Sequence, residues 1–342
     1  GGIISYSPIT YDFDLYRLNP YSMMWENYQL HKNDFISLIN GKGYLYATKE
    51  TKTIAFQEPF VSGSLKDVPL EQGWNLVGNP FIADAYVNRA FYRMNAEGTG
   101  IEPVVANFDE YVPTKIPACT GIVVYAETSD ETVNFIKDVP FTATNGQGHL
   151  TIALTQADSR DNSTLDKAIV NFNEGGQLGK FYFGEQNANI YIPRNHDEYA
   201  IIHSDRRSDV DVHFKAKEFG YYTISFASEN TDINGIQLID LFTNDIIDLS
   251  ENSSYTFTGS PADRAARFKL VFNNVSEENG IFAYQNGDDI IVDGEGELQM
   301  FDVMGRLVAN QRINGVETIA KHEQAGIYIL KMNEKTQKIV VK

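Results

Sequence analysis

The residues from Ile281 to Lys342 read IFAYQNGDDIIVDGEGELQMFDVMGRLVANQRINGVETIAKHEQAGIYILKMNEKTQKIVVK. Short segments of this stretch alternate apolar and polar side chains, which is the period of a half-buried β-strand. Leu298 and Met300, for example, lie on the opposite face from Gln299. Met304-Gly305-Arg306 is typical of a hairpin turn, because glycine adopts a positive φ without steric cost. About six short strands fit into the stretch, which predicts a small β-sandwich.

Three pieces of this stretch, Gly296–Val308, Ala325–Lys331 and Lys338–Lys342, resemble the C-terminal sorting domain of type IX (Por) secretion in Bacteroidetes. The sorting domain of that family has an immunoglobulin-like sandwich fold. The resemblance therefore implies the same architecture that the alternation predicts. It also implies recognition by the secretion machinery and removal of the domain as the cargo is anchored. The residues of the sorting motif in this chain are Gly305, Gly326, Tyr328, Lys331, Lys338 and Lys342.

Length and charge narrow the possible classes of protein. A single hydrophobic core stops growing near ~250–300 residues, so we expect at least two units in a chain of this length. The 342 residues include 46 acidic and 28 basic side chains, for a net charge of −18. A negative field of this kind repels phosphate backbones, which argues against nucleic-acid binding. No apolar run approaches the ~18 residues of a membrane-spanning helix, so we expect no transmembrane segment.

Cysteine content and the beginning of the chain add two expectations. Cys119 is the only cysteine, so the chain forms no internal disulfide and no cysteine metal cluster. Its place before the apolar run Gly121–Tyr125 favours a packed free thiol over a catalytic nucleophile. We recognise no signal peptide, although export needs one. We therefore expect a mature or excised C-terminal piece of a longer, exported protein.

The first third of the chain contains a repeat, with units at about 1–70 and 71–139. Asp14-Leu15-Tyr16-Arg17-Leu18-Asn19 matches Ala90-Phe91-Tyr92-Arg93-Met94-Asn95. Further along, Tyr46-Ala47 matches Tyr125-Ala126. The spacing between these matches is longer than a solenoid unit, which favours a duplicated β-unit over an array.

Aromatic residues of the repeats are the candidate ligand contacts. Gly73–Phe81 reads GWNLVGNPF and resembles a GWNL(I/V)GNPF segment found upstream of sorting domains in large Bacteroidetes surface proteins. Trp74 in this segment is expected to fill a core, and stacking on a ligand is the alternative. Trp25 and Tyr28 lie outside the core-like strands and are the better candidates for an exposed aromatic platform.

Residues 140–275 form the next expected domain, and residues 276–342 form the sorting domain. Runs such as Leu150–Leu154, Ala168–Phe172 and Tyr221–Phe226 are separated by turns rich in Gly, Asn and Asp, which is typical of a β-sandwich. The polar stretch Asn273–Gly280 is the expected linker. The predicted fold class is thus all-β, with several β-sandwich domains and an immunoglobulin-like C-terminal domain.

Catalytic motifs are absent from the sequence, which contains no Gly-x-Ser-x-Gly elbow and no His-Glu-x-x-His spacing. Asp209, Asp211 and His213 fall on one face of a strand and are a candidate zinc or calcium site, with a solvated face as the alternative. We expect no cofactor and no enzyme activity. Paired carboxylates for glycoside hydrolysis need no sequence proximity, so that possibility stays open.

The sequence therefore predicts a non-enzymatic C-terminal region of an exported, adhesin-like cell-surface protein. Its expected partners are the secretion machinery, through the last domain, and a glycan or a host or bacterial surface protein. The alternative is a set of accessory or carbohydrate-binding modules of a larger secreted enzyme.

Overall fold

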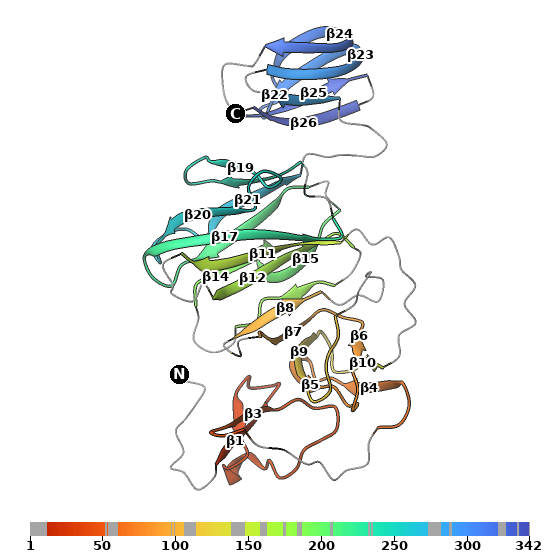
Figure 1. Ribbon diagram of the computed structural model, residues 1–342, viewed down its shortest axis with the longest axis vertical. Helices are drawn as coiled ribbons and strands as arrows, with labels where there is room; N and C mark the ends of the chain where they lie inside the picture. The colour runs from red at the N-terminus through yellow and green to blue at the C-terminus, as the bar shows by residue number, and fades with distance from the viewer. Residues whose placement is uncertain are drawn as a thin grey trace. The chain divides into compact units, whose positions relative to one another are not determined.

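The computed structural model of the protein is built from β-strands (Figure 1). It describes residues 12–51, 53, 61–96, 98, 100–105, 114–137, 148–157, 163–173, 176–182, 187–205, 208–231, 233, 235–272, 282–286, 289–320, 326–333 and 335–341. Within these ranges no α-helix occurs, and the helical turn η1 (His31–Asn33) is a short 3₁₀ segment. The prediction of an all-β protein with several sheets is confirmed.

The chain divides into two compact units. The first comprises residues 1–205, 212–232 and 254–266, and the second comprises residues 206–211, 233–253 and 267–342.

The first repeat lies in the first unit and forms an antiparallel sheet in the order β2-β1-β3. Its strands are β1 (Phe13–Leu18), β2 (Trp25–Asn27) and β3 (Leu45–Thr48). Aromatic rings pack together on this repeat, with Phe35 stacked on Tyr44 at 5.5 Å between ring centroids. The Arg17 guanidinium lies over the Phe35 ring at 4.9 Å from its centroid. This small cluster buries Phe35 almost completely.

The second repeat, together with Leu65–Pro69 from the end of the first, forms two antiparallel sheets that share one core. One sheet has the order β5-β9-β7-β8 and the other the order β4-β10-β6. The strands are β4 (Leu65–Pro69), β5 (Gly73–Gly78), β6 (Tyr86–Val87), β7 (Phe91–Met94), β8 (Ile101–Val104), β9 (Gly121–Ala126) and β10 (Thr132–Ile136). Side chains from both sheets, among them Phe91, Val124 and Phe135, form the buried cluster between them. Alternation along each strand supplies these inward-facing positions.

The repeats share their local strand pairing. In the first, Arg17 of β1 lies opposite Glu26 of β2, and in the second, Arg93 of β7 lies opposite Glu102 of β8. The repeats also join edge to edge, since the Gly43 N–H donates to the Leu76 carbonyl at 2.9 Å. Strand β5 thus has the segment around Gly43 on one edge and β9 on the other.

The middle part of the first unit forms a larger sheet, in the order β16-β14-β15-β12-β11-β17-β20, and β13 also pairs with β15. The strands are β11 (His149–Gln156), β12 (Thr164–Asn171), β13 (Leu178–Gly179), β14 (Asn189–Arg194), β15 (Asp197–His203), β16 (Val210–Lys215), β17 (Gly220–Glu229) and β20 (Ser254–Gly259). Strands β12 and β15 run parallel, and β11–β12, β11–β17, β14–β15, β14–β16 and β17–β20 pair antiparallel. Figure 1 shows β11, β12, β15 and β17 running beside one another.

The second unit contains three further strands in the order β19-β18-β21. They are β18 (Ile236–Asp240), β19 (Ile246–Asp248) and β21 (Ala266–Phe272). Asp240 and Arg267 form a buried ion pair at 2.8 Å here. The Arg267 guanidinium also lies 4.9 Å from the centroid of the Phe242 ring. Asp240 thus neutralises the buried guanidinium of Arg267, and the Phe242 ring packs against the same group.

The C-terminal sheet, also in the second unit, has the order β22-β23-β25-β26, with β24 paired to β23. Its strands are β22 (Ala283–Asn286), β23 (Asp289–Asp302), β24 (Leu307–Ala320), β25 (Gly326–Met332) and β26 (Lys335–Val341). About six strands were expected by alternation, and the described residues form these five. The predicted hairpin is confirmed, because Gly305 has a φ of 77° between β23 and β24. The expected linker lies outside the described residues.

Candidate functional site

The predicted aromatic platform is placed differently by the structure. Trp25 was expected outside the core-like strands, and it opens the three-residue strand β2, where it lies half-buried opposite Leu18 of β1. Tyr28 packs edge-on against Phe35, with 5.4 Å between ring centroids. Tyr28 keeps 38% of its surface exposed. Pairing of β2 with β1 was not visible in the sequence because β2 spans only three residues. Ligand binding by these two side chains stays a prediction.

The three candidate metal ligands have other neighbours. Asp209 is paired with Lys338, whose Nζ lies 2.9 Å from Oδ1. Asp211 lies 3.5 Å from Lys269, and His213 packs edge-on against Tyr191 at 5.3 Å between centroids. In the part of the chain that the structure describes, no group of three His, Cys, Asp or Glu side chains is arranged to hold a metal ion. The structure therefore does not bring these three residues together as a metal site.

The residues of the sorting motif are spread through the C-terminal sheet. Gly305 forms the β23–β24 turn, and Gly326, Tyr328 and Lys331 lie on β25. Tyr328 is buried in the core of the sheet, whereas Lys331 is exposed. Lys338 lies on β26, and Lys342 lies outside the described residues.

Cys119 differs from the expectation of a packed thiol. It is exposed and has a φ of 59°, in the turn that precedes β9. The turn is closed by the Thr120 N–H, which donates to the Pro117 carbonyl at 3.2 Å. The prediction failed because a positive φ directs the residue out of the strand that follows.

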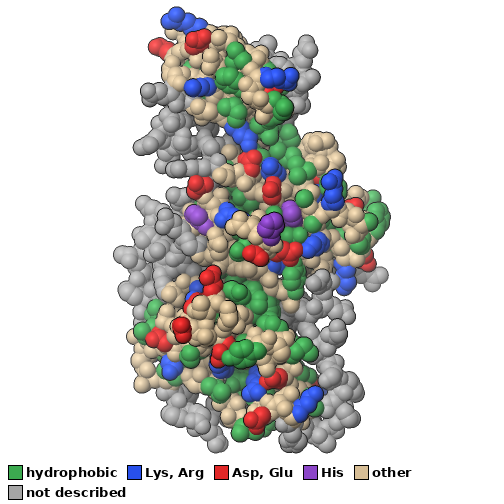
Figure 2. Space-filling view, turned by 180° about the vertical axis from the view of Figure 1, so that it is seen from behind, with side chains coloured by type: hydrophobic (Ala, Val, Ile, Leu, Met, Phe, Trp, Pro, Cys, Tyr) green, Lys and Arg blue, Asp and Glu red, His purple; other side chains and the backbone are tan. Residues whose placement is uncertain are grey.

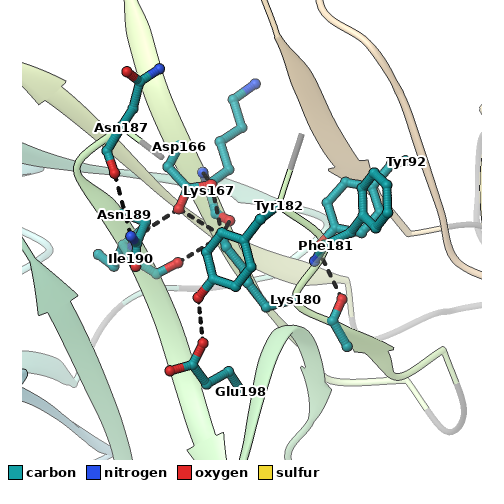
Figure 3. Close-up of polar contacts among 11 residues, drawn as sticks. Tyr92, Asp166, Lys167, Lys180, Phe181, Tyr182, Asn187, Asn189, Ile190 and Glu198 are labelled. Carbon is teal, nitrogen blue, oxygen red and sulfur yellow. Dashed lines mark hydrogen bonds and ion pairs between the residues drawn. The ribbon is translucent and has the colours of Figure 1, made fainter. Parts of the chain in front are cut away.

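A group of polar contacts lies where the second repeat meets the middle sheet, and we call it the junction (Figure 3). Tyr92 of β7 is 2% exposed. Its hydroxyl donates to the Gly179 carbonyl at 3.0 Å and accepts from the Phe181 N–H at 3.1 Å. Burial raises the pKa of Tyr92 well above its usual range. The hydroxyl therefore stays protonated and holds the segment after β13 against the repeat.

Apolar side chains from both regions surround these hydrogen bonds. Trp74 of β5 packs against Phe181, Tyr125 and Tyr92, with centroid separations of 4.9, 5.1 and 5.8 Å. The buried cluster behind them contains Ala90, Tyr92, Val105, Val123, Ile169, Leu178, Ala200 and Ile201. Residues on both sides of position 140 thus share one core. Trp74 fills part of that core, as expected.

Lys180 and Asp166 form a second element of the junction. The Lys180 side chain is 3% exposed, and its Nζ lies 2.6 Å from an Asp166 oxygen. The ammonium also donates to the Ile190 carbonyl at 2.9 Å. Asp166 in turn accepts the Ile190 N–H at 2.8 Å. Every group of this buried pair has hydrogen-bond partners, which is the condition for holding charges out of water.

The junction continues outward through Tyr182, Glu198 and Lys215. Tyr182 donates to Glu198, and Lys215 lies 2.7 Å from the same carboxylate. Burial, together with the hydrogen bond to Glu198, raises the pKa of Tyr182 well above its usual range. Burial works to raise the pKa of Glu198, but hydrogen bonds from Lys215 and Tyr182 hold it below its usual range.

Glu102 links the repeat to the middle sheet by charge. It lies 2.8 Å from Arg93 of its own repeat and 2.5 Å from Lys167 of β12. Burial works to raise the pKa of Glu102, but hydrogen bonds from Lys167 and Arg93 hold it below its usual range. Glu102, Asp166 and Glu198 thus each pair with a lysine, and the pair of Glu102 with Lys167 joins the repeat to the middle sheet.

Sequence reasoning missed the junction, although one signal was present. Lys180 stands in the apolar run Leu178-Gly179-Lys180-Phe181-Tyr182, and a single lysine in such a run often marks a buried pair. Its partner Asp166 is 14 residues away on another strand. The sequence does not show that pairing.

Two observations concern the molecular surface. On the face that Figure 2 shows, acidic and basic side chains lie interspersed rather than gathered by sign. None of the described helical segments is long and apolar enough to cross a membrane.

Comparisons of the chain with protein-family models, with curated proteins and with solved structures found no match.

Proposed function

We propose that this chain is the non-enzymatic C-terminal region of an exported, adhesin-like cell-surface protein. In this proposal the C-terminal sheet is an immunoglobulin-like sorting domain that the secretion machinery recognises. The preceding repeats and middle sheet act as a rigid spacer that presents contact surfaces.

The observation that carries the proposal is the separate core of the C-terminal sheet. Its described buried cluster is drawn from residues 282–341 alone and includes Leu298, Leu330 and Ile339. A small domain with its own core folds as a unit, which suits a label that is attached to different cargo. Gly305, Gly326, Tyr328, Lys331 and Lys338, the described residues of the motif that resembles the sorting family, lie on or between the strands of this sheet.

The junction supports the spacer role of the rest of the chain. Tyr92 and Glu102 tie the second repeat to the middle sheet, by hydrogen bonds to Gly179 and Phe181 and by an ion pair with Lys167. A shared core across the junction resists bending between the two regions. Rigid connection of this kind is what a spacer at a cell surface requires.

The test is the location of the full-length protein, with and without residues 276–342, in the organism that encodes it. Surface labelling of intact cells is expected to reach the complete protein and to miss the truncated one. Protease resistance of the truncated protein after cell lysis checks that its other domains are folded. Equal surface labelling of both forms would contradict the proposal.

A further inference from the structure

One face of the first repeat carries tyrosines at both of its sides. In an antiparallel sheet, residues that lie opposite one another point to the same face. Leu15 of β1 lies opposite Tyr46 of β3. On its other side the Leu15 carbonyl accepts the Tyr28 N–H at 2.9 Å, at the end of β2. Tyr28 and Tyr46 therefore flank Leu15 on one face, which we call the tyrosine face.

The rings on this face are fixed in place by one another. The Phe13 ring, two residues before Leu15, lies 5.9 Å from the Tyr46 ring between centroids, with the planes 28° apart. It lies 6.5 Å from the Tyr28 ring, with the planes 34° apart. Tyr28 also packs edge-on against the buried Phe35. The two tyrosine rings are thus oriented by the fold itself.

The second repeat has valines at the two equivalent positions. Val104 is equivalent to Tyr28, because each lies opposite the residue that precedes the repeat tyrosine. Val124 is equivalent to Tyr46, because each directly follows the residue opposite that tyrosine. Both valines belong to the core between the two sheets of the second repeat.

The first repeat exposes what the second repeat buries. Val104 and Val124 are 7% and 0% exposed, whereas Tyr28 and Tyr46 are 38% and 37% exposed. Within the described residues neither tyrosine hydroxyl has a hydrogen-bond partner, so both are available to a ligand. Tyrosine suits a surface of this kind, because its ring is apolar and its hydroxyl is polar. The exchange of two core valines for two tyrosines turns a packing face into a contact face.

The charges beside the tyrosine face cancel. Arg17 follows Leu15 by two residues, and its guanidinium lies 2.6 Å from the Glu26 carboxylate on β2. The Asn19 amide donates to the same carboxylate at 2.8 Å. A paired charge attracts little beyond its partner, so we expect a ligand of this face to carry no net charge.

We propose that the tyrosine face binds a neutral glycan, with Tyr28 and Tyr46 as the contact residues. The C–H groups of a pyranose ring form an apolar face that packs on an aromatic ring, and the sugar hydroxyls can bond to those of tyrosine. Trp25 is not part of this site, because it lies three residues before Tyr28 and so on the opposite face of the sheet. Glycan binding at this face rests on the adhesin-like role proposed above and names the class of its ligand.

The probe is an array of neutral hexasaccharides of glucose, mannose, galactose and N-acetylglucosamine. We expect the full chain to bind at least one of them, and calorimetry then measures the dissociation constant. Tyr46→Val installs the residue of the second repeat, and we expect binding to weaken about ten-fold or more. Tyr28→Phe keeps the ring against Phe35 and removes only the hydroxyl, so we expect binding to weaken about two- to ten-fold.

The matched control is Tyr221→Val. Tyr221 is 52% exposed on β17 and lies on another sheet, so we expect its replacement to leave glycan binding unchanged. Thermal unfolding checks that each variant is folded. If Tyr46→Val does not fold, Tyr28→Phe decides the matter, because it preserves the ring packing.

The outcomes separate this site from the sorting function. The binding assay uses purified chain, so failed export with intact glycan binding counts against the sorting domain alone. Normal export without glycan binding counts against the tyrosine face alone. The proposal is overturned if no neutral hexasaccharide binds, if the folded tyrosine-face variants bind as well as the unchanged chain, or if a sialylated glycan or a proline-rich peptide binds more tightly than every neutral glycan.

Discussion

The two repeats have the same strand pairing and a different surrounding. In each, a Tyr-Arg pair lies on a strand whose arginine faces a glutamate on the next strand, Arg17 with Glu26 at 2.6 Å and Arg93 with Glu102 at 2.8 Å. In the second repeat the Tyr92 hydroxyl makes two hydrogen bonds to the middle sheet. In the first repeat the equivalent Tyr16 is 6% exposed, and its hydroxyl has no hydrogen-bond partner among the described residues.

This difference separates what a repeat sequence dictates from what its context adds. Cross-strand pairs act over short range and are set by the residues of the hairpin itself. The value of a buried hydroxyl depends on whether another part of the chain supplies a partner. The equivalent tyrosines therefore act differently. The Tyr92 hydroxyl bonds two regions together, whereas the Tyr16 hydroxyl is buried without a partner among the described residues.

The largest expected effect comes from breaking the segment on which the second repeat docks. Lys180→Met leaves the Asp166 carboxylate buried without its cation, and we expect the free energy of unfolding to fall by about 3–5 kcal/mol. Urea denaturation measures this loss. Hydrogen exchange is expected to accelerate in β7 of the second repeat and to stay unchanged in β1 of the first.

The control for that prediction is Lys215→Met. The Lys215 side chain is 47% exposed, and its pair with Glu198 is therefore screened by water. We expect a loss below about 1 kcal/mol. Equal losses in the two lysine variants would show that burial of the Lys180 pair does not govern the junction.

A second comparison uses glycines at equivalent places in the repeats. Gly43 and Gly121 each stand two residues before the strand partner of the repeat tyrosine. A Cβ on Gly43 would lie 2.7 Å from the Val77 carbonyl oxygen. A Cβ on Gly121 would lie 3.6 Å from the same oxygen, which is an ordinary contact. We expect Gly43→Ala to lower the free energy of unfolding by about 1–3 kcal/mol, because the added methyl group would overpack the contact between the joined repeats. Thermal unfolding is expected to show a change of about 0.5 kcal/mol or less for Gly121→Ala, and the reverse order would contradict the edge-to-edge joining of the repeats.

The tyrosines themselves give the sharpest contrast. Tyr92→Phe leaves the Gly179 carbonyl and the Phe181 N–H without their partner, and we expect a cost of about 1–3 kcal/mol. Tyr16→Phe removes a buried hydroxyl for which the described part of the chain supplies no partner, so we expect no loss or a gain of up to about 1 kcal/mol. Denaturant unfolding of both variants measures the difference. Losses of the same size in both would mean that the two hydroxyls are equivalent after all.

The smallest effect concerns acid. The pKa values of Glu26 and Glu102 are both held below the ordinary 4.5, against the effect of burial, by hydrogen bonds from Asn19 and Arg17 and from Lys167 and Arg93 respectively. A lowered pKa stabilises the fold fully above that ordinary value and loses its contribution as the pH falls through the folded pKa. Because Glu102 has two cationic partners, we expect Glu102→Gln to flatten the acid side of the stability curve more than Glu26→Gln, by about 0.5–1 kcal/mol. Identical curves of stability against pH for the two variants would show that the second cationic partner of Glu102 adds nothing to its stabilising effect.

Local features of this fold could be read from the sequence. Alternation predicted the all-β class, and the glycine of Met304-Gly305-Arg306 predicted the turn that ends β23. The matching of Tyr46-Ala47 with Tyr125-Ala126 was one residue out of step with the structure. The register places Leu45 opposite Tyr16 and Val123 opposite Tyr92. Side-chain period alone does not fix register, since that also depends on the partner strand.

The junction and the hydrogen bonds of Gln337 to the backbone at Phe282 and Ala283 could not be read in the same way. Tyr92 and Phe181 are 89 residues apart, and Gln337 and Phe282 are 55 apart. Contacts at such separation depend on how whole sheets pack, and no pattern within a strand encodes them. The exposed position of Cys119 was missed for a related reason, because its φ of 59° follows from the turn and not from the apolar strand beside it.

The central claim is that the C-terminal sheet is a self-contained sorting label. The most direct measurement fuses residues 276–342 to a periplasmic reporter enzyme and compares a Bacteroidetes strain that has a working type IX apparatus with an isogenic strain that lacks it. The account predicts reporter activity at the surface or in the medium only when both the fused residues and the apparatus are present. Reporter that stays in the periplasm of the competent strain, or that leaves both strains equally, would contradict it.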